Sequence, residues 1–137
     1  MRAAILGCTS VAIVAMVMLY AGRARAELRV VGEGKARVID ARQFAEDERA
    51  GYETFKVRCT KCHEMNRPIT AILTGVTPVS GSKFDANEVK RYVVKMMRKP
   101  NSGISREDAK EVLGFLRRAL ELAGQDKNDN ASGTDEK

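Results

Sequence analysis

The spacing of hydrophobic residues predicts helices in the second half of the chain, and the signal is strongest near the C-terminus. Between Ser105 and Gly124 the apolar residues recur every three or four positions, which places them on one face of a helix. These residues are Ala109, Val112, Leu113, Leu116, Leu120 and Ala123. Ser105 with Asp108 is a capping signal, and Gly124 is a common residue at a helix end. We therefore expect one amphipathic helix between Ser105 and Gly124.

A second helix is predicted from Asp85 to Lys99. Asp85 with Glu88 is close to a capping box. Apolar side chains then follow at helical spacing, at Val89, Tyr92, Val93 and Met96. Pro100 disfavours helix at the residue before it, so the helix is expected to end there.

Weaker patterns precede these two helices. Acidic residues at 46–48 suit the positive end of a helix dipole, and Tyr52 and Phe55 give the residues that follow an apolar side. These features predict a helix over 46–58. The segment 64–84 contains prolines and glycines, and we interpret it as a loop with room for a single helical turn.

The predicted helices lie between two segments of different character. Residues 27–46 contain two short stretches of extended character, separated by Gly32 and Gly34, and we interpret them as an arm before a helical domain at 47–123. Residues 124–137 are polar and small, which predicts a disordered tail.

Residues 1–26 have the three parts of a secretory signal peptide. Arg2 forms a short positive region, Ala3 to Tyr20 is largely apolar, and Ala24-Arg25-Ala26 is a small-x-small cleavage pattern. We expect this segment to be removed, which leaves an exported, periplasmic protein with no membrane attachment. The apolar run approaches membrane-spanning length, so the alternative is an uncleaved N-terminal anchor.

Composition and charge narrow the class of protein. The 137 residues are enough for one small domain. The net charge is +6, and removal of residues 1–26, which hold three arginines and no acid, lowers it to +3. This modest charge on an exported chain argues against nucleic acid as a partner. Aromatic residues make up 5% of the chain and Trp is absent, so a buried cofactor could supply apolar bulk that the core lacks.

The most specific pattern in the chain is Cys59-Thr60-Lys61-Cys62-His63. Two thiols at this spacing can add to the two vinyl groups on one edge of a haem, and the imidazole of His63 can bind the iron as its proximal ligand. A zinc site would need about four ligands, and the processed chain has lost Cys8 and has no other Cys or His. A thioredoxin-like pair would want a βαβ setting, and a plain disulfide leaves His63 without a role. We therefore predict one covalently attached haem c.

The residues around this motif resemble those of class I, single-haem cytochromes c. In that family a glycine and an aromatic residue lie eight and four residues before the first cysteine, where this chain has Gly51 and Phe55. The last helix of the family carries an apolar residue and then an aromatic–leucine pair, and it crosses the first helix at the glycine. Val112, Phe115 and Leu116 match these positions. The resemblance implies an all-α fold of three to five helices wrapped around the haem.

The resemblance has two further implications. Members of the family brace the proximal histidine with a proline that follows the motif, and Pro68 and Pro78 are both candidates. The interval between His63 and Met96 is short for the family, which implies a compact distal loop.

The second axial ligand of the iron is predicted to be a methionine, because the processed chain has no second histidine. Met65 lies too close to His63 to reach the opposite face easily. At about 100° per residue, Met96 clusters with the apolar residues before it, whereas Met97 lies about 80–100° away. The resemblance also favours Met96, because the distal methionine of the family tends to lie three residues after a valine, here Val93. Met97 is the alternative ligand, and a third reading leaves both methionines in the core and the iron five-coordinate or bound by a lysine.

Positive charge concentrates around the predicted distal methionine, at Lys90, Arg91, Lys95, Arg98 and Lys99. These residues are either a solvated helix face or a docking surface for redox partner proteins of acidic character. We expect a monomeric electron carrier that is not an enzyme, because a methionine on the iron blocks the site that catalysis or gas binding would need. The alternatives are a haem domain with an open distal site, for gas sensing or peroxidase-like chemistry, and a haem subunit of a larger oxidoreductase.

Overall fold

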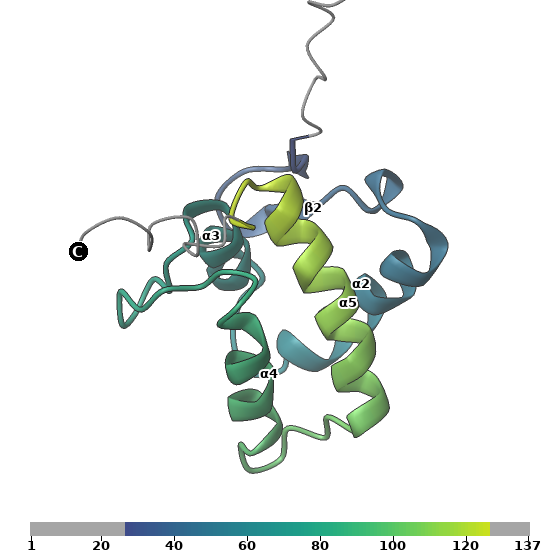
Figure 1. Cartoon of the computed structure of the whole chain (residues 1–137), viewed down its shortest axis with the longest axis vertical. Helices are drawn as coiled ribbons and strands as arrows, with labels where there is room; N and C mark the ends of the chain where they lie inside the picture. Colours follow the sequence, from purple (N-terminus) through teal and green to yellow (C-terminus); the bar gives the residue numbers. More distant parts are fainter. Residues whose placement is uncertain (1–26, 127–137) are drawn as a thin grey trace, which may run out of the picture.

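The computed structural model describes residues 27–126 and shows a mostly helical protein (Figure 1). Its α-helices are α2 (Glu46–Cys59), α3 (Asn66–Thr74), α4 (Val89–Met97) and α5 (Arg106–Leu122). They follow an antiparallel pair of strands and two 3-10 turns, which are β1 (Val30–Val31), η1 (Gly34–Ala36), β2 (Val38–Ile39) and η2 (Ala41–Gln43). This architecture agrees with the all-α class expected from the sequence. The predicted signal peptide or anchor, and residues 127–137 of the predicted tail, lie outside the described residues.

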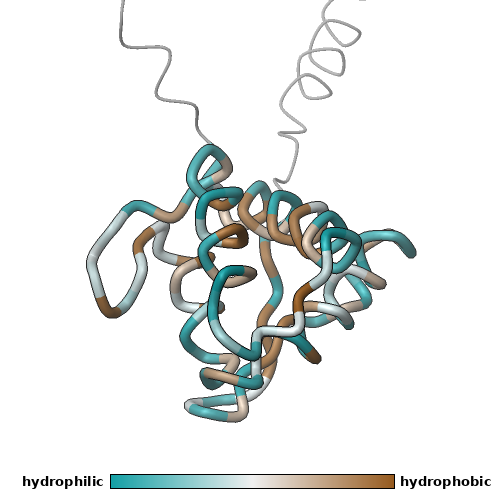
Figure 2. The backbone as a smooth tube through the Cα atoms, turned by 90° about the horizontal axis from the view of Figure 1, so that it is seen from below, coloured by the Kyte–Doolittle hydropathy of each residue, from teal (hydrophilic) through white to brown (hydrophobic). Residues whose placement is uncertain are grey.

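Helices α2 and α5 begin close to where the sequence predicts them. The hydroxyl of Ser105 accepts a hydrogen bond from the N–H of Asp108 at 3.0 Å, and the Asp108 carboxylate accepts one from the N–H of Ser105 at 2.8 Å. This exchange is the expected capping box of α5. In α2, Glu48 accepts a hydrogen bond from the N–H of Ala45. Figure 2 shows hydrophobic and hydrophilic stretches alternating along the helices, as expected when each helix buries one side.

Helix α3 lies where the sequence predicted a loop with a single turn. Pro68 stands in the first turn of the helix, where a missing N–H removes no helical hydrogen bond. Ile69 and Ile72 are fully buried and hold the helix against the core. Gly75 ends it with a φ of 70°, a backbone conformation that glycine adopts without strain.

Helix α4 begins at Val89 rather than at the predicted Asp85. The carboxylate of Asp85 accepts hydrogen bonds from the N–H groups of Asn87 and Glu88, at 2.9 and 3.0 Å. Asp85 therefore caps a turn that leads into the helix. The apolar positions keep their predicted side, because Val89 and Val93 are buried.

Helices α2 and α5 cross at Gly51 (Figure 1). A Cβ added to Gly51 would lie 2.4 Å from the carbonyl oxygen of Glu111 and 3.0 Å from the Cβ of Phe115, so only glycine allows this approach. The ring of Phe115 is fully buried, and three other rings have centroids 5.0–5.3 Å from its own, those of Phe44, Tyr52 and Phe55. Val112 and Leu116 are buried beside it on α5. The crossing fixes the end of α2, and with it the cysteine–histidine motif, against α5.

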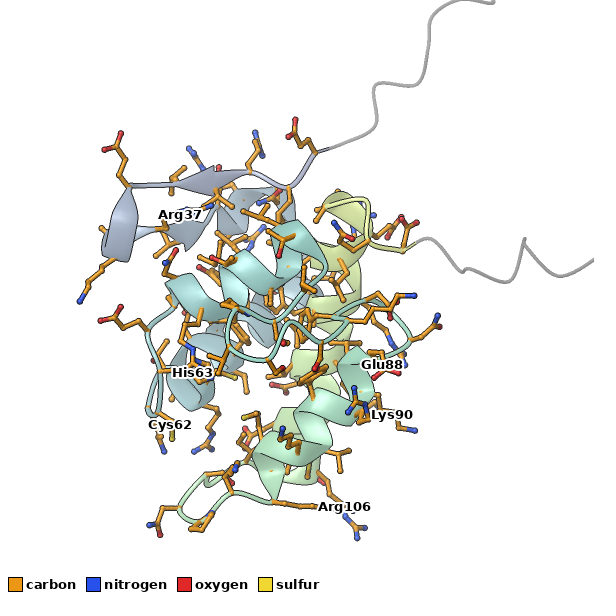
Figure 3. All side chains as sticks on the ribbon, turned by 90° about the vertical axis from the view of Figure 1, so that its left-hand side faces the viewer. Arg37, Cys62, His63, Glu88, Lys90 and Arg106 are labelled. Carbon is orange, nitrogen blue, oxygen red and sulfur yellow. The ribbon has the colours of Figure 1, made fainter. Side chains whose placement is uncertain are left out.

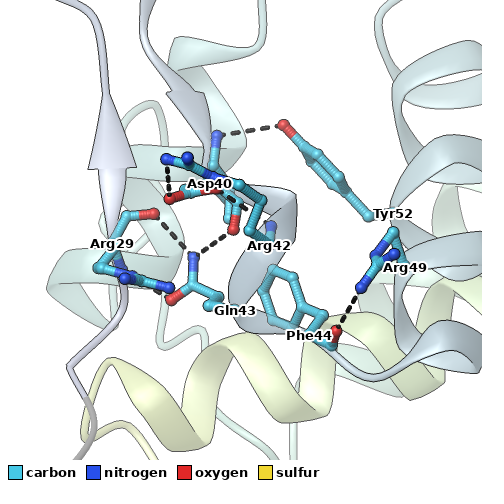
Figure 4. A network of polar contacts seen from close by, with 8 residues as sticks. Arg29, Asp40, Arg42, Gln43, Phe44, Arg49 and Tyr52 are labelled. Atoms are coloured by element: carbon cyan, nitrogen blue, oxygen red, sulfur yellow. Dashed lines mark hydrogen bonds and ion pairs between the residues drawn. The ribbon is translucent and has the colours of Figure 1, made fainter.

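The segment interpreted as an arm contributes three side chains to the same buried core, Leu28, Ile39 and Phe44. The N–H of Ile39 donates a hydrogen bond to the hydroxyl of Tyr52 at 3.1 Å, which ties β2 to α2. Figure 4 shows the polar network at this point, in which Asp40 pairs with Arg42 and the side-chain amide of Gln43 donates to two backbone carbonyls. The hairpin is thus fastened to the helical body.

Candidate functional site

A cavity of about 340 Å³ opens between the end of α2, helix α4 and the loop at 76–84. Cofactor sites in proteins measure about 300–1,000 Å³. The walls are largely apolar, with contributions from Phe55, Ala71, Phe84, Val93, Val112 and Leu116. Cys59, His63 and Met96 also line the cavity. Three of the residues that the sequence singles out for a haem site therefore meet in one place.

The motif lies at the end of α2. Cys59 is the last residue of the helix and is half-buried, and His63 follows in the next turn, also half-buried. Cys62 is exposed and is not part of the cavity wall. Figure 3 shows Cys62 and His63 in the same turn, and both cysteines are free thiols. The structure brings Cys59 to His63 at the cavity but leaves Cys62 at the surface.

Burial controls the ionisation of this turn. It lowers the pKa of His63, and the positive charge of Arg67 acts in the same direction, so the imidazole is neutral at physiological pH. Neutral imidazole is the form that binds metal ions. The Nδ1 atom of His63 is buried, and its nearest backbone groups, those of His63 and Glu64, form no hydrogen bond of regular geometry with it. Burial, together with the charge of Cys62, raises the pKa of the Cys59 thiol to about 11.

The three methionines of the described chain have different surroundings. Met96 on α4 lines the cavity together with His63. Met97 does not line it and packs against the buried core, half-buried itself. Met65 is buried in that core and also lies outside the cavity wall. Of the two candidate distal ligands, the cavity contains Met96 and not Met97.

Basic residues surround the cavity. Lys95 and Lys99 line it beside Met96, and Arg58 and Arg67 line it from α2 and α3. No Asp or Glu of the part of the chain that the structure describes contributes to its wall. The five basic residues that the sequence groups around Met96 are all exposed and border a shallow groove on the outer side of α4; they are Lys90, Arg91, Lys95, Arg98 and Lys99.

Sequence reasoning missed two parts of the site. The first is most of the loop at 76–84, in which the sequence singles out Pro78 alone; the loop lines the cavity through residues 77–80, and Val79 is 75% exposed. The second is the pair of arginines, Arg58 and Arg67, which no periodic pattern marks. The sequence feature that could have identified them is their closeness to the motif, since Arg58 directly precedes Cys59. Both candidate bracing prolines, Pro68 and Pro78, line the cavity.

Comparisons with family models, with curated proteins and with solved structures found no match. Within residues 27–126, no group of three or more His, Cys, Asp or Glu side chains could hold a metal ion. None of the helices in the same range has the length and hydropathy needed to cross a bilayer. The residues of the cavity are therefore the basis for a functional assignment.

Proposed function

We propose that the protein is a single-haem cytochrome c that carries electrons, with its haem bound covalently in the cavity beside α4. The observation that carries this proposal is that Cys59 and His63 of the motif and Met96 of a separate helix, α4, line one largely apolar cavity. Thiol, neutral imidazole and thioether are the side-chain groups that attach and coordinate a haem of this type. The crossing of α2 and α5 at Gly51 supports the resemblance to class I cytochromes c.

The residues of the motif and Met96 would have separate roles in binding the haem. Cys59 and Cys62 would attach the haem through thioether bonds, and the exposed side chain of Cys62 would have to turn toward the cavity to do so. His63 and Met96 would hold the iron. A bound haem would supply reversible one-electron exchange between ferric and ferrous iron, and a methionine ligand raises its reduction potential.

The cavity wall suits a carrier rather than a catalyst. Phe55, Val112 and Leu116 are buried side chains on the inner side, and they keep water away from the site. As an iron ligand, Met96 would compete with oxygen, carbon monoxide or peroxide. The cations around the mouth can neutralise the carboxylates of a haem and attract an acidic partner. We therefore favour an electron carrier over gas sensing, over peroxidase-like chemistry and over a role as an enzyme subunit.

The setting of this function is proposed from the sequence. Residues 1–26 direct export to the periplasm, and the protein works there as a monomer with acidic redox proteins as partners. The basic groove of α4 serves as the docking surface, because Lys95 and Lys99 belong to both the groove and the cavity. Charges at this position would bring a partner directly to the mouth of the haem site.

Carbon monoxide binding tests the carrier function against the alternatives. In a carrier the oxidised protein shows a methionine–iron absorption band, and the reduced protein binds carbon monoxide slowly because Met96 must first dissociate. Rapid binding together with no such band in the wild-type protein would instead indicate an open distal site and a sensing or peroxidase-like function.

A further inference from the structure

The segment before Cys59 and the segment after Met96 meet at an ion pair. The Nε atom of Arg58 lies 3.2 Å from Oδ2 of Asp108, and a second guanidinium nitrogen lies 3.5 Å from Oδ1. Arg58 belongs to the last turn of α2, and Asp108 to the first turn of α5. The pair therefore lies on the side of the cavity that is next to the loop between α4 and α5.

Asp108 also holds the loop that follows α4. Its carboxylate accepts the N–H of Ser105, the last residue of the 98–105 loop, at 2.8 Å. The other end of the loop is tied to α4, because the hydroxyl of Ser102 donates to the carbonyl of Met97 at 3.0 Å. Ile104 from this loop lines the cavity. One carboxylate thus joins the loop after Met96 to the helix that ends at Cys59.

The middle of the loop lies near the same segment. A Cβ added to Gly103 would lie 3.6 Å from Nζ of Lys61 and 3.8 Å from a guanidinium nitrogen of Arg58, which is ordinary contact distance. Lys61 lies between the two cysteines of the motif. The loop therefore passes near two cations of the haem-binding segment.

The pair is only partly exposed to solvent. The side chains are 33% and 16% exposed, so solvent screens them only in part. The N–H of Ser105 contributes most to lowering the pKa of Asp108, and the charge of Arg58 acts in the same direction to a smaller extent.

We propose that the Arg58–Asp108 ion pair is a latch that holds the loop after α4 against the haem-binding segment and so keeps Met96 on the iron. Arg58 is then a positioning residue, which acts through the loop and not by touching the iron. This inference rests on the proposed haem site. It adds that the Arg58–Asp108 ion pair, at the end of the loop farther from Met96, partly sets how long the iron–methionine bond lasts.

The test compares Arg58→Gln with Arg118→Gln in the haem-containing protein. Arg118 is the control, because it joins α5 to α2 through Glu48 at 3.7 Å, is 34% exposed and does not line the cavity; it also pairs with Glu121 on its own helix at 2.7 Å. Glutamine removes the charge and, unlike methionine, adds no further thioether to the cavity wall. Asp108→Asn is the second variant. It removes the carboxylate charge of the ion pair at a position outside the motif, and it keeps an oxygen that can accept the N–H of Ser105.

We expect Arg58→Gln and Asp108→Asn to speed carbon monoxide binding to the reduced protein about two- to fivefold, the range for loss of a partly exposed ion pair. The double variant should add nothing further, as expected when one contact is removed twice. Amide exchange at Ser102 and Ser105 should also rise in both single variants. Arg118→Gln should lower thermal stability without changing either measurement.

The latch is overturned if Asp108→Asn leaves carbon monoxide binding and loop exchange unchanged, even where Arg58→Gln alters them. It is overturned equally if Arg118→Gln has the same effect as Arg58→Gln. A wild-type protein without haem, or without a methionine–iron band, would instead remove the proposed function itself.

Discussion

His63 and Met96 are fixed in the cavity by different means. The imidazole stands in the turn that follows α2, and burial keeps it neutral. The thioether depends on the rotation of α4, because successive residues of a helix point about 100° apart. Met96 therefore lines the cavity while Met97 packs against the core. The two neighbouring methionines form a natural pair of test and control.

Replacing Met96 by Ala should remove the methionine–iron band of the oxidised protein and leave a high-spin or weak-ligand spectrum. Replacing Met97 by Ala should keep the band and lower the free energy of unfolding by about 1–2 kcal/mol, because a half-buried side chain is lost. Absorption spectra and thermal unfolding of both variants check this. Loss of the band in the Met97→Ala protein alone would make Met97 the ligand. A band that is unchanged in both variants would exclude both methionines as ligands.

The crossing of α2 and α5 is the element-scale feature that positions the motif. The backbone of α5 comes so close to Gly51 that a methyl group would overlap the carbonyl oxygen of Glu111. Backbone cannot move away as a flexible side chain can, so the helices must separate to admit any larger residue. A shift of α2 would carry Cys59 and His63 with it.

Replacing Gly51 by Ala should lower the free energy of unfolding by about 1–3 kcal/mol, through overpacking at the crossing. Gly114 is the matched control, because it lies within α5 and a Cβ there meets nothing within 4 Å. Its change to Ala should be neutral or raise stability by about 0.5–1 kcal/mol, since alanine favours helix. Chemical denaturation measures both. A Gly51→Ala protein as stable as the wild type would show that the crossing is not tight.

The elements that the sequence predicts well carry their signals locally. Ser105 and Asp108 cap α5 as expected, since a capping box and a regular apolar stripe need no tertiary context. Helix α3 was missed because Pro68 and Gly75 were interpreted as marks of a loop, whereas they stand in its first turn and at its end. The hairpin packing was missed because two-residue strands are too short to show an alternating pattern.

At the scale of the whole molecule, the site combines charges that are far apart in sequence. Arg58, Arg67, Lys95 and Lys99 come from three regions and gather at one cavity. The cysteine–histidine motif is local and could be predicted, but this gathering depends on how α4 packs against α5. A net positive field at the cavity mouth would attract an acidic partner to the proposed haem site and weaken as salt screens it.

Changing Lys95 and Lys99 together to Gln should slow the second-order electron exchange with an acidic flavoprotein about tenfold at low ionic strength. The control is Lys110 and Arg117 changed to Gln, which removes two exposed charges from α5 away from the cavity. Stopped-flow rates over a range of salt concentrations check this, and the difference should vanish at high salt. Equal slowing by both double variants would point to net charge rather than to a docking surface.

Covalent haem attachment is the central claim, and a pyridine haemochrome spectrum combined with the intact mass of the protein tests it most directly. We predict the spectrum of a c-type haem and a polypeptide mass raised by one haem that acid extraction does not remove. The double change of Cys59 and Cys62 to Ala should abolish both signals. A polypeptide of unmodified mass, or a haem that acid extraction releases, would contradict the account.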